Sequence, residues 1–114
     1  MKTNLTLTAL IIATFAFAYC TTSKNASDTV VKVNYDHNVK PVIETYCSPC
    51  HFPSKGGNKK AYDNFVNVKQ DIDHIIRRVQ LTPGTRGFMP FGKAHQLNES
   101  TIAVFKLWKA DGMN

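Results

Sequence analysis

The chain has 114 residues, of which 43% are hydrophobic and 19% are charged, and its formal net charge is +6. This length allows one small domain and excludes large catalytic folds such as a β/α barrel or a doubly wound sheet. The composition is neither that of a disordered chain nor that of collagen, and three cysteines are too few for a disulfide-rich scaffold.

The N-terminal segment has the pattern of a secretory signal. Lys2 precedes an apolar run over residues 5–18, which is shorter than the about 20 residues of a membrane-spanning helix. The alternative is a retained N-terminal anchor helix. Two cleavage sites compete. Ala16-Phe17-Ala18 fits ordinary signal peptidase, whereas Phe17-Ala18-Tyr19-Cys20 resembles a bacterial lipobox, although Phe17 and Tyr19 depart from its usual Leu and small residue.

We favour the lipobox, in which Cys20 becomes the lipidated first residue of an exported protein. An unmodified thiol there would be a liability in an oxidising compartment, and Cys20 begins a polar stretch that suits a flexible tether. The chain then divides into a signal peptide (1–19), a tether (20–34) and a folded domain (35–114). Removal of residues 1–19 leaves 95 residues and lowers the net charge to +5, because Lys2 is the only charged residue lost. So small a domain would gain from a large apolar cofactor.

A first helix is predicted over residues 39–46. Asn38 is a suitable N-cap, and Pro41 falls in the first turn, where its missing N–H is tolerated. The apolar stripe at helical spacing consists of Val39, Val42, Ile43 and Tyr46. This helix leads directly into the most informative motif of the chain.

That motif is Cys47-Ser48-Pro49-Cys50-His51, the attachment signature of a c-type haem. Two thiols at this spacing can add to the two vinyl groups of one porphyrin edge. The imidazole of His51 then offers a nitrogen to the iron as proximal ligand. The motif predicts one covalently bound haem c, which would also supply the core that a short domain lacks.

Three other interpretations of the motif stay open. A zinc site would need a fourth ligand beside the two cysteines and His51, and only single residues such as His74 or His95 offer one. A thioredoxin-like redox pair would need a βαβ setting, and the third alternative is a plain disulfide between Cys47 and Cys50. The full signature is more specific than a bare C-x-x-C pair.

Two further helices and a loop are predicted next. The first helix is short, over residues 61–68, and the second has Asp71 as its candidate cap and ends at Pro83-Gly84. The apolar stripe of the second consists of Ile72, Ile75, Ile76 and Val79. The Gly- and Pro-rich loop over residues 84–92 has Met89 at its centre. Such a loop can wrap a flat face and direct a thioether at iron.

A last helix opens at Asn98 or Ser100 and stops at Gly112. Its apolar side chains are Ile102, Phe105, Leu107 and Trp108. No segment alternates strictly enough between apolar and polar residues to predict a pair of strands. The predicted fold class is therefore all-α.

The haem motif, Met89-Pro90 and the aromatic-bearing helix that ends in Leu107–Gly112 together resemble the small class I cytochromes c. The resemblance covers residues 35–114 and implies a cytochrome c-like fold of three to five helices wrapped around one haem. It implies thioethers at Cys47 and Cys50, and His51 and Met89 as iron ligands. The first and last helices are then expected to cross; the facing residues would be Val39, Ile43, Phe105 and Trp108.

Met89 has rivals as the second iron ligand. It could be a core methionine between Phe88 and Phe91 instead. The other candidate ligands are Met113, His37, His74 and His95. The candidate partners of the haem propionates are Arg86, Lys93 and the indole of Trp108. Pro53 follows the motif earlier than the corresponding family proline, and the sequence identifies no acceptor for the ring N–H of His51.

Charge and size limit the function. Four lysines would form a basic rim that steers an acidic redox protein: Lys55, Lys59, Lys60 and Lys93. The alternative is an ordinary solvated surface. Nucleic-acid binding is not expected, because the chain is exported and its basic residues are not interleaved with aromatic ones.

The predicted function is a monohaem cytochrome that carries single electrons between redox partners in the bacterial cell envelope, in the periplasm or anchored to a membrane through Cys20. The alternatives are a haem subunit of a larger respiratory complex and a small-ligand sensor with an open sixth position on the iron. An enzyme is not expected, because the sequence has no general-base constellation.

Overall fold

The computed structural model describes residues 32–114. The predicted signal peptide, the candidate lipidation site Cys20 and most of the predicted tether lie outside the described residues. Within residues 32–114, no helix combines the length and the apolar character needed to cross a membrane.

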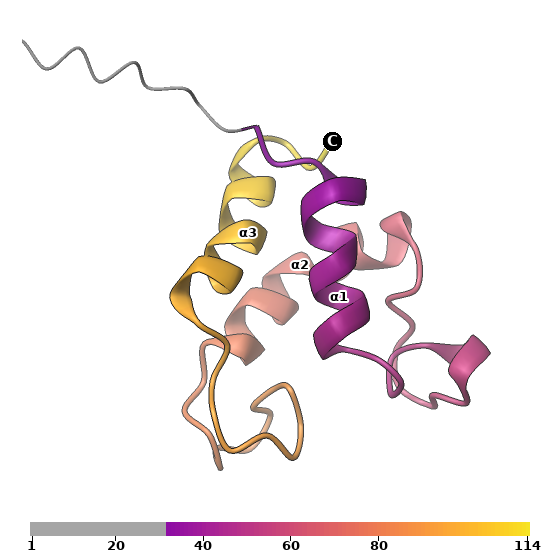
Figure 1. Ribbon diagram of the computed structural model, residues 1–114, viewed down its shortest axis with the longest axis vertical. Coiled ribbons are helices and arrows are strands. Elements are labelled where there is room, and N and C mark those ends of the chain that lie inside the picture. The colour runs from indigo at the N-terminus through magenta and orange to yellow at the C-terminus, as the bar shows by residue number, and fades with distance from the viewer. Residues whose placement is uncertain (1–31) are drawn as a thin grey trace, which may run out of the picture.

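Helices form all the regular structure of residues 32–114, which confirms the all-α fold class. The three α-helices are α1 (Lys40–Tyr46), α2 (Phe65–Val79) and α3 (Glu99–Ala110). A π-helical turn, η1 (Tyr35–Val39), runs into α1, and a 3₁₀ turn, η2 (Pro53–Lys55), follows it. In Figure 1, α1 and α3 flank α2, which crosses behind them.

The first helical segment begins earlier than predicted, at Tyr35, and its cap is Asn34. The side-chain oxygen of Asn34 accepts hydrogen bonds from the backbone N–H groups of Asp36 (2.9 Å) and His37 (3.3 Å). Asn38 is therefore not the N-cap; its side-chain oxygen accepts the N–H of Asn34 at 2.9 Å. The two asparagines close the helix start reciprocally, in the manner of a capping box.

α2 is one continuous helix where the sequence predicted two. Its cap is Asn64, whose side-chain oxygen accepts the N–H of Asn67 at 3.0 Å. The predicted cap at Asp71 is wrong, because Asp71 lies buried in the helix interior. One unbroken stripe explains the continuity, with its members alternately three and four residues apart: Phe65, Val68, Ile72, Ile75 and Val79.

α3 follows the prediction closely. Asn98 caps it by accepting the N–H of Thr101 at 2.8 Å, and Gly112 ends it with a φ of +84°, which favours glycine. The indole of Trp108 is fully buried and donates to the backbone oxygen of Asn114 at 3.0 Å. The suggestion that this indole serves a haem propionate is therefore wrong.

The helices meet around Trp108. The centroid of its ring system lies 5.5 Å from that of Tyr35 in η1 and 5.8 Å from that of Phe65 in α2. The four residues expected at the crossing of the first and last helices all belong to this core: Val39, Ile43, Phe105 and Trp108. The expected contact between the first helical segment and the last helix is present, and it is made through η1, which contacts α3.

The two ends of the described chain meet at one end of the helices. The N–H of Tyr35 donates to the backbone oxygen of Asn114 at 3.3 Å, and the N–H of Val33 donates to the carboxylate of Asp111 at 3.0 Å. Figure 1 shows the long loop before α3 at the opposite end. That end contains the candidate site.

Candidate functional site

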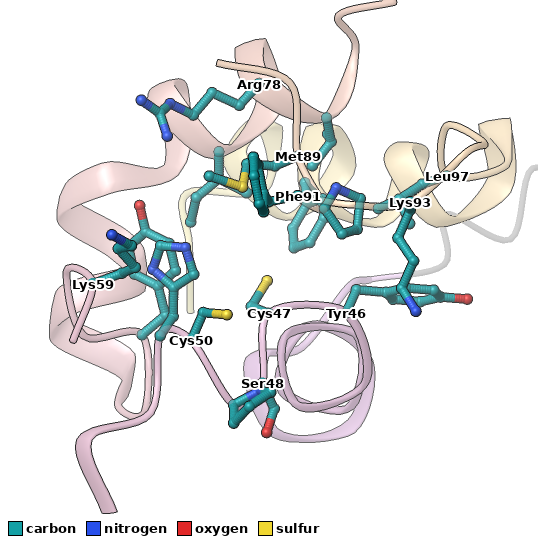
Figure 2. Close-up of a pocket in the computed structure, with 17 residues that line it drawn as sticks. Tyr46, Cys47, Ser48, Cys50, Lys59, Arg78, Met89, Phe91, Lys93 and Leu97 are labelled. Atoms are coloured by element: carbon teal, nitrogen blue, oxygen red, sulfur yellow. The ribbon is translucent and has the colours of Figure 1, made fainter. Parts of the chain in front are cut away.

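A cavity of about 660 Å³ lies between the end of α1, the C-terminal half of α2 and the loop before α3. Cofactor sites typically measure about 300–1,000 Å³. All four predicted haem residues line it: Cys47, Cys50, His51 and Met89. In Figure 2 the sulfur atoms of Cys47, Cys50 and Met89 point toward one shared space. Most other lining residues are apolar, among them Ile75, Val79, Leu97 and Phe105.

The haem motif follows the end of α1 at Tyr46 as a series of turns. The N–H of Cys47 donates to the carbonyl of Ile43 at 2.9 Å, and the N–H of His51 donates to the carbonyl of Cys47 at 3.0 Å. Both are steps of four residues, as in an α-helix. The turns place both Cys47 and His51 at the cavity.

Both cysteines of the motif are free thiols. Cys50 is exposed, whereas Cys47 is half-buried, and burial raises the pKa of the Cys47 thiol to about 12. A thioredoxin-like cysteine needs the opposite shift, because its thiolate is the nucleophile. The environment of Cys47 therefore disfavours the redox-pair interpretation.

The ring of His51 is buried, and its orientation is fixed by the backbone. Nδ1 lies 2.6 Å from the carbonyl oxygen of Lys60. A carbonyl only accepts, so Nδ1 carries the proton and the lone pair is on Nε2. An imidazole that binds a metal through Nε2 has this tautomer, and a backbone carbonyl is a common partner for its other N–H. The sequence did not reveal Lys60, because a main-chain acceptor has no side-chain signature.

Met89 is the sulfur ligand candidate that faces the two thiols. Its N–H donates to the carbonyl of Arg78 at 3.2 Å, which ties the loop to the end of α2. The four rival ligands are not among the cavity's lining residues: Met113, His37, His74 and His95. The three histidines are exposed, and Met113 packs against the core instead.

A zinc ion bound by Cys47, Cys50 and His51 would need a fourth ligand, and neither predicted candidate lies at the cavity. His74 and His95, the two singletons that could complete a tetrahedron, are exposed and lie outside the lining. From residue 32 onward, no three His, Cys, Asp or Glu side chains gather in a way that would hold a metal ion.

Three cationic side chains border the cavity: Lys59, Arg78 and Lys93. Lys93 was predicted as a propionate partner, but Arg86 is exposed and is not among the lining residues. Arg78 was missed, although it follows Ile75 by three residues and precedes Val79 on the buried side of α2. The three-residue step from Ile75 to Arg78 is the sequence signal that could have placed Arg78 beside the cavity.

The predicted basic rim is only partly present at the cavity. Lys59 and Lys93 border it. Lys60 pairs with the carboxylate of Asp71 at 2.7 Å, and the Lys55 ammonium lies 5.1 Å from the ring centroid of Phe52. Two of the four lysines thus lie at the cavity, and the other two interact elsewhere.

The chain after the motif folds back against it. The N–H of Lys59 donates to the carbonyl of Cys50 at 3.1 Å, and the N–H of Tyr62 donates to the carbonyl of His51 at 2.9 Å. Gly57 lies so close that a Cβ there would clash with the carbonyl oxygens of Pro49 and Cys50. Glycine is therefore needed at this position for steric reasons.

Gly57→Ala is expected to destabilise the protein by about 1–3 kcal/mol, because the motif must shift to admit a methyl group. Urea unfolding measures this change. Ser54→Ala, at an exposed site in η2, is the control and should stay within about 0.5 kcal/mol of wild type. An unfolding midpoint for Gly57→Ala equal to that of the control would contradict the close approach.

Comparisons with protein-family models, with curated proteins and with solved structures found no match for this chain.

Proposed function

We propose that the chain is a monohaem c-type cytochrome that transfers single electrons between redox partners in the cell envelope, rather than an enzyme. The observation that carries this proposal is the cavity where two free thiols, the His51 ring and the Met89 thioether meet. Imidazole and thioether are the axial pair of the cytochromes c.

Four features of the cavity support the haem proposal: its sulfur and nitrogen donors, its apolar walls, its cations and its volume. Cys47 and Cys50 are unpaired and can form thioethers. The apolar walls suit a porphyrin face, and the cations Lys59, Arg78 and Lys93 suit its two carboxylates. The volume of about 660 Å³ is that of a cofactor site.

When bound, the haem supplies an iron that alternates between the ferrous and ferric states. The protein contributes the environment. His51 is held with its Nε2 lone pair free, because Nδ1 donates to Lys60. Met89 is held by the hydrogen bond of its N–H to Arg78. If these two residues fill both axial positions, no site on the iron is left for a substrate, which suits an electron carrier.

The redox partner is expected to be acidic at its contact surface. Lys59 and Lys93 border the mouth of the cavity, and the ring of Phe91 beside them is 84% exposed. A basic rim with an apolar contact gives fast, weak association that depends on ionic strength.

Intact mass spectrometry under denaturing conditions tests the haem attachment. The protein, expressed with a c-type maturation system, should retain the mass of one haem after unfolding. A peptide spanning residues 47–51 should carry it. A chain that never retains haem would overturn the proposal.

We also propose that Cys20 is lipidated and anchors the domain to a membrane, on the sequence evidence alone. Cys20→Ser should move the protein from the membrane fraction to the soluble fraction, because the lipid would be lost. Fractionation followed by immunoblotting measures the distribution. Persistent membrane association of the variant would contradict lipidation as the anchor.

A further inference from the structure

Asp71 is a buried carboxylate in the interior of α2, only 7% exposed. Both of its oxygens are engaged: Oδ1 accepts from the ammonium of Lys60 at 2.7 Å, and Oδ2 accepts from the hydroxyl of Tyr62. Burial by itself would raise the pKa of Asp71, but these hydrogen bonds outweigh burial and hold the pKa below its usual value. Asp71 is thus a charged, fully paired carboxylate.

Both partners of Asp71 contact His51. The carbonyl of Lys60 accepts from Nδ1 of His51 at 2.6 Å. The ring of Tyr62 stacks on the imidazole, with centroids 4.4 Å apart and planes within 8° of parallel. The N–H of Tyr62 also donates to the carbonyl of His51 at 2.9 Å. The segment 60–62 therefore holds both the ring proton and the ring plane of His51, and Asp71 fastens this segment to α2.

Stability alone does not explain this arrangement. The Lys60 side chain is 56% exposed, and ion pairs with an exposed partner contribute little to stability. A buried ion pair is often replaceable as a whole by packed apolar side chains without loss of stability. An apolar residue at position 71 could not hold both Lys60 and Tyr62 by hydrogen bonds.

We propose that Asp71 is a positioning residue for His51, which sets the reduction potential through Lys60 and Tyr62. This inference rests on the proposed haem ligation. A firm hydrogen bond from Nδ1 makes the imidazole a stronger donor, and a stronger donor favours the ferric iron. Loss of the Asp71 carboxylate loosens that hydrogen bond and therefore raises the potential.

The test compares Asp71→Asn with Asp73→Asn in the haem-loaded protein. Asp73 lies on the same helix and also pairs with a lysine, Lys109, but its side chain is 71% exposed and this pair does not involve the segment 60–62. Both variants lose one negative charge. We expect Asp71→Asn to favour reduction by about threefold to tenfold, which is about 28–59 mV at 59 mV per tenfold for one electron. Asp73→Asn should stay near wild type.

Exchange of the His51 Nδ1 proton with solvent, measured by NMR on the ferrous protein, is the second readout. We expect faster exchange in Asp71→Asn and in Tyr62→Phe, which keeps the stacked ring but removes the hydroxyl. Tyr62→Phe decides the question if Asp71→Asn does not fold. If Asp71→Asn and Tyr62→Phe have the same reduction potential and the same exchange rate of the His51 Nδ1 proton as Asp73→Asn, the positioning role is wrong. The haem would still be in place in that case. A wild-type protein without covalent haem would instead overturn the proposed function.

Discussion

Removal of both motif thiols, by Cys47→Ala with Cys50→Ala, is expected to abolish covalent haem and to leave a poorly folded chain. Without an occupant, the apolar walls around Ile75, Val79 and Phe105 would border a cavity of about 660 Å³. The cavity opens to solvent, because Cys50 and Phe91 in its lining are exposed, so the expected loss is that of the apolar contacts between these walls and the haem. Domains are stable by only about 5–15 kcal/mol in total, and a domain this small has few other apolar contacts to replace those with the haem.

Far-UV circular dichroism and urea unfolding of the double variant measure this loss. Cys50→Ala alone is the graded control, because it retains the Cys47 thiol and can keep one thioether. The single variant should hold haem and most of its helix content. A double variant that folds stably without haem would show that the haem is not part of the core.

Met89→Ala is expected to lower the reduction potential on the order of 100 mV, a fraction of the about 0.8 V that axial ligands span. Loss of the thioether removes the ligand that favours the ferrous state. It also opens a coordination position, so that carbon monoxide should change the spectrum of the reduced protein. Potentiometric titration and optical spectra measure the two effects.

Met113→Ala is the matched control for that experiment. Met113 is also half-buried, but it packs against the core near the chain end and is not among the cavity's lining residues. Its loss should leave the potential and the carbon monoxide response unchanged. Unchanged spectra for Met89→Ala would exclude Met89 as the iron ligand and would favour the sensor interpretation.

The parts of this protein that sequence predicted well are those where the signal is local. The motif from Cys47 to His51 is contiguous, and Met89 stands alone in a Gly- and Pro-rich loop. α3 has a cap at Asn98, a clear stripe and a stop at Gly112. Each of these signals lies within a few residues and needs no knowledge of the fold.

The features that sequence missed depend on contacts between distant segments. Asn38 and Asn34 are equally good caps by local rules, but the extra turn packs against α3 through the tilted contact of the Tyr35 ring with Trp108. Asp71 has the position of a cap before an apolar stripe. Its burial is tolerated only because Lys60 and Tyr62 come back to it from another segment.

The most direct test of the central claim is an optical spectrum of the matured protein, oxidised, reduced, and reduced under carbon monoxide. Ligation by His51 and Met89 predicts a covalent haem spectrum with the weak far-red band of ferric iron bound to a thioether and no response to carbon monoxide. A protein without haem would contradict the account. A haem that binds carbon monoxide readily would contradict the assignment of Met89 and with it the electron-carrier function.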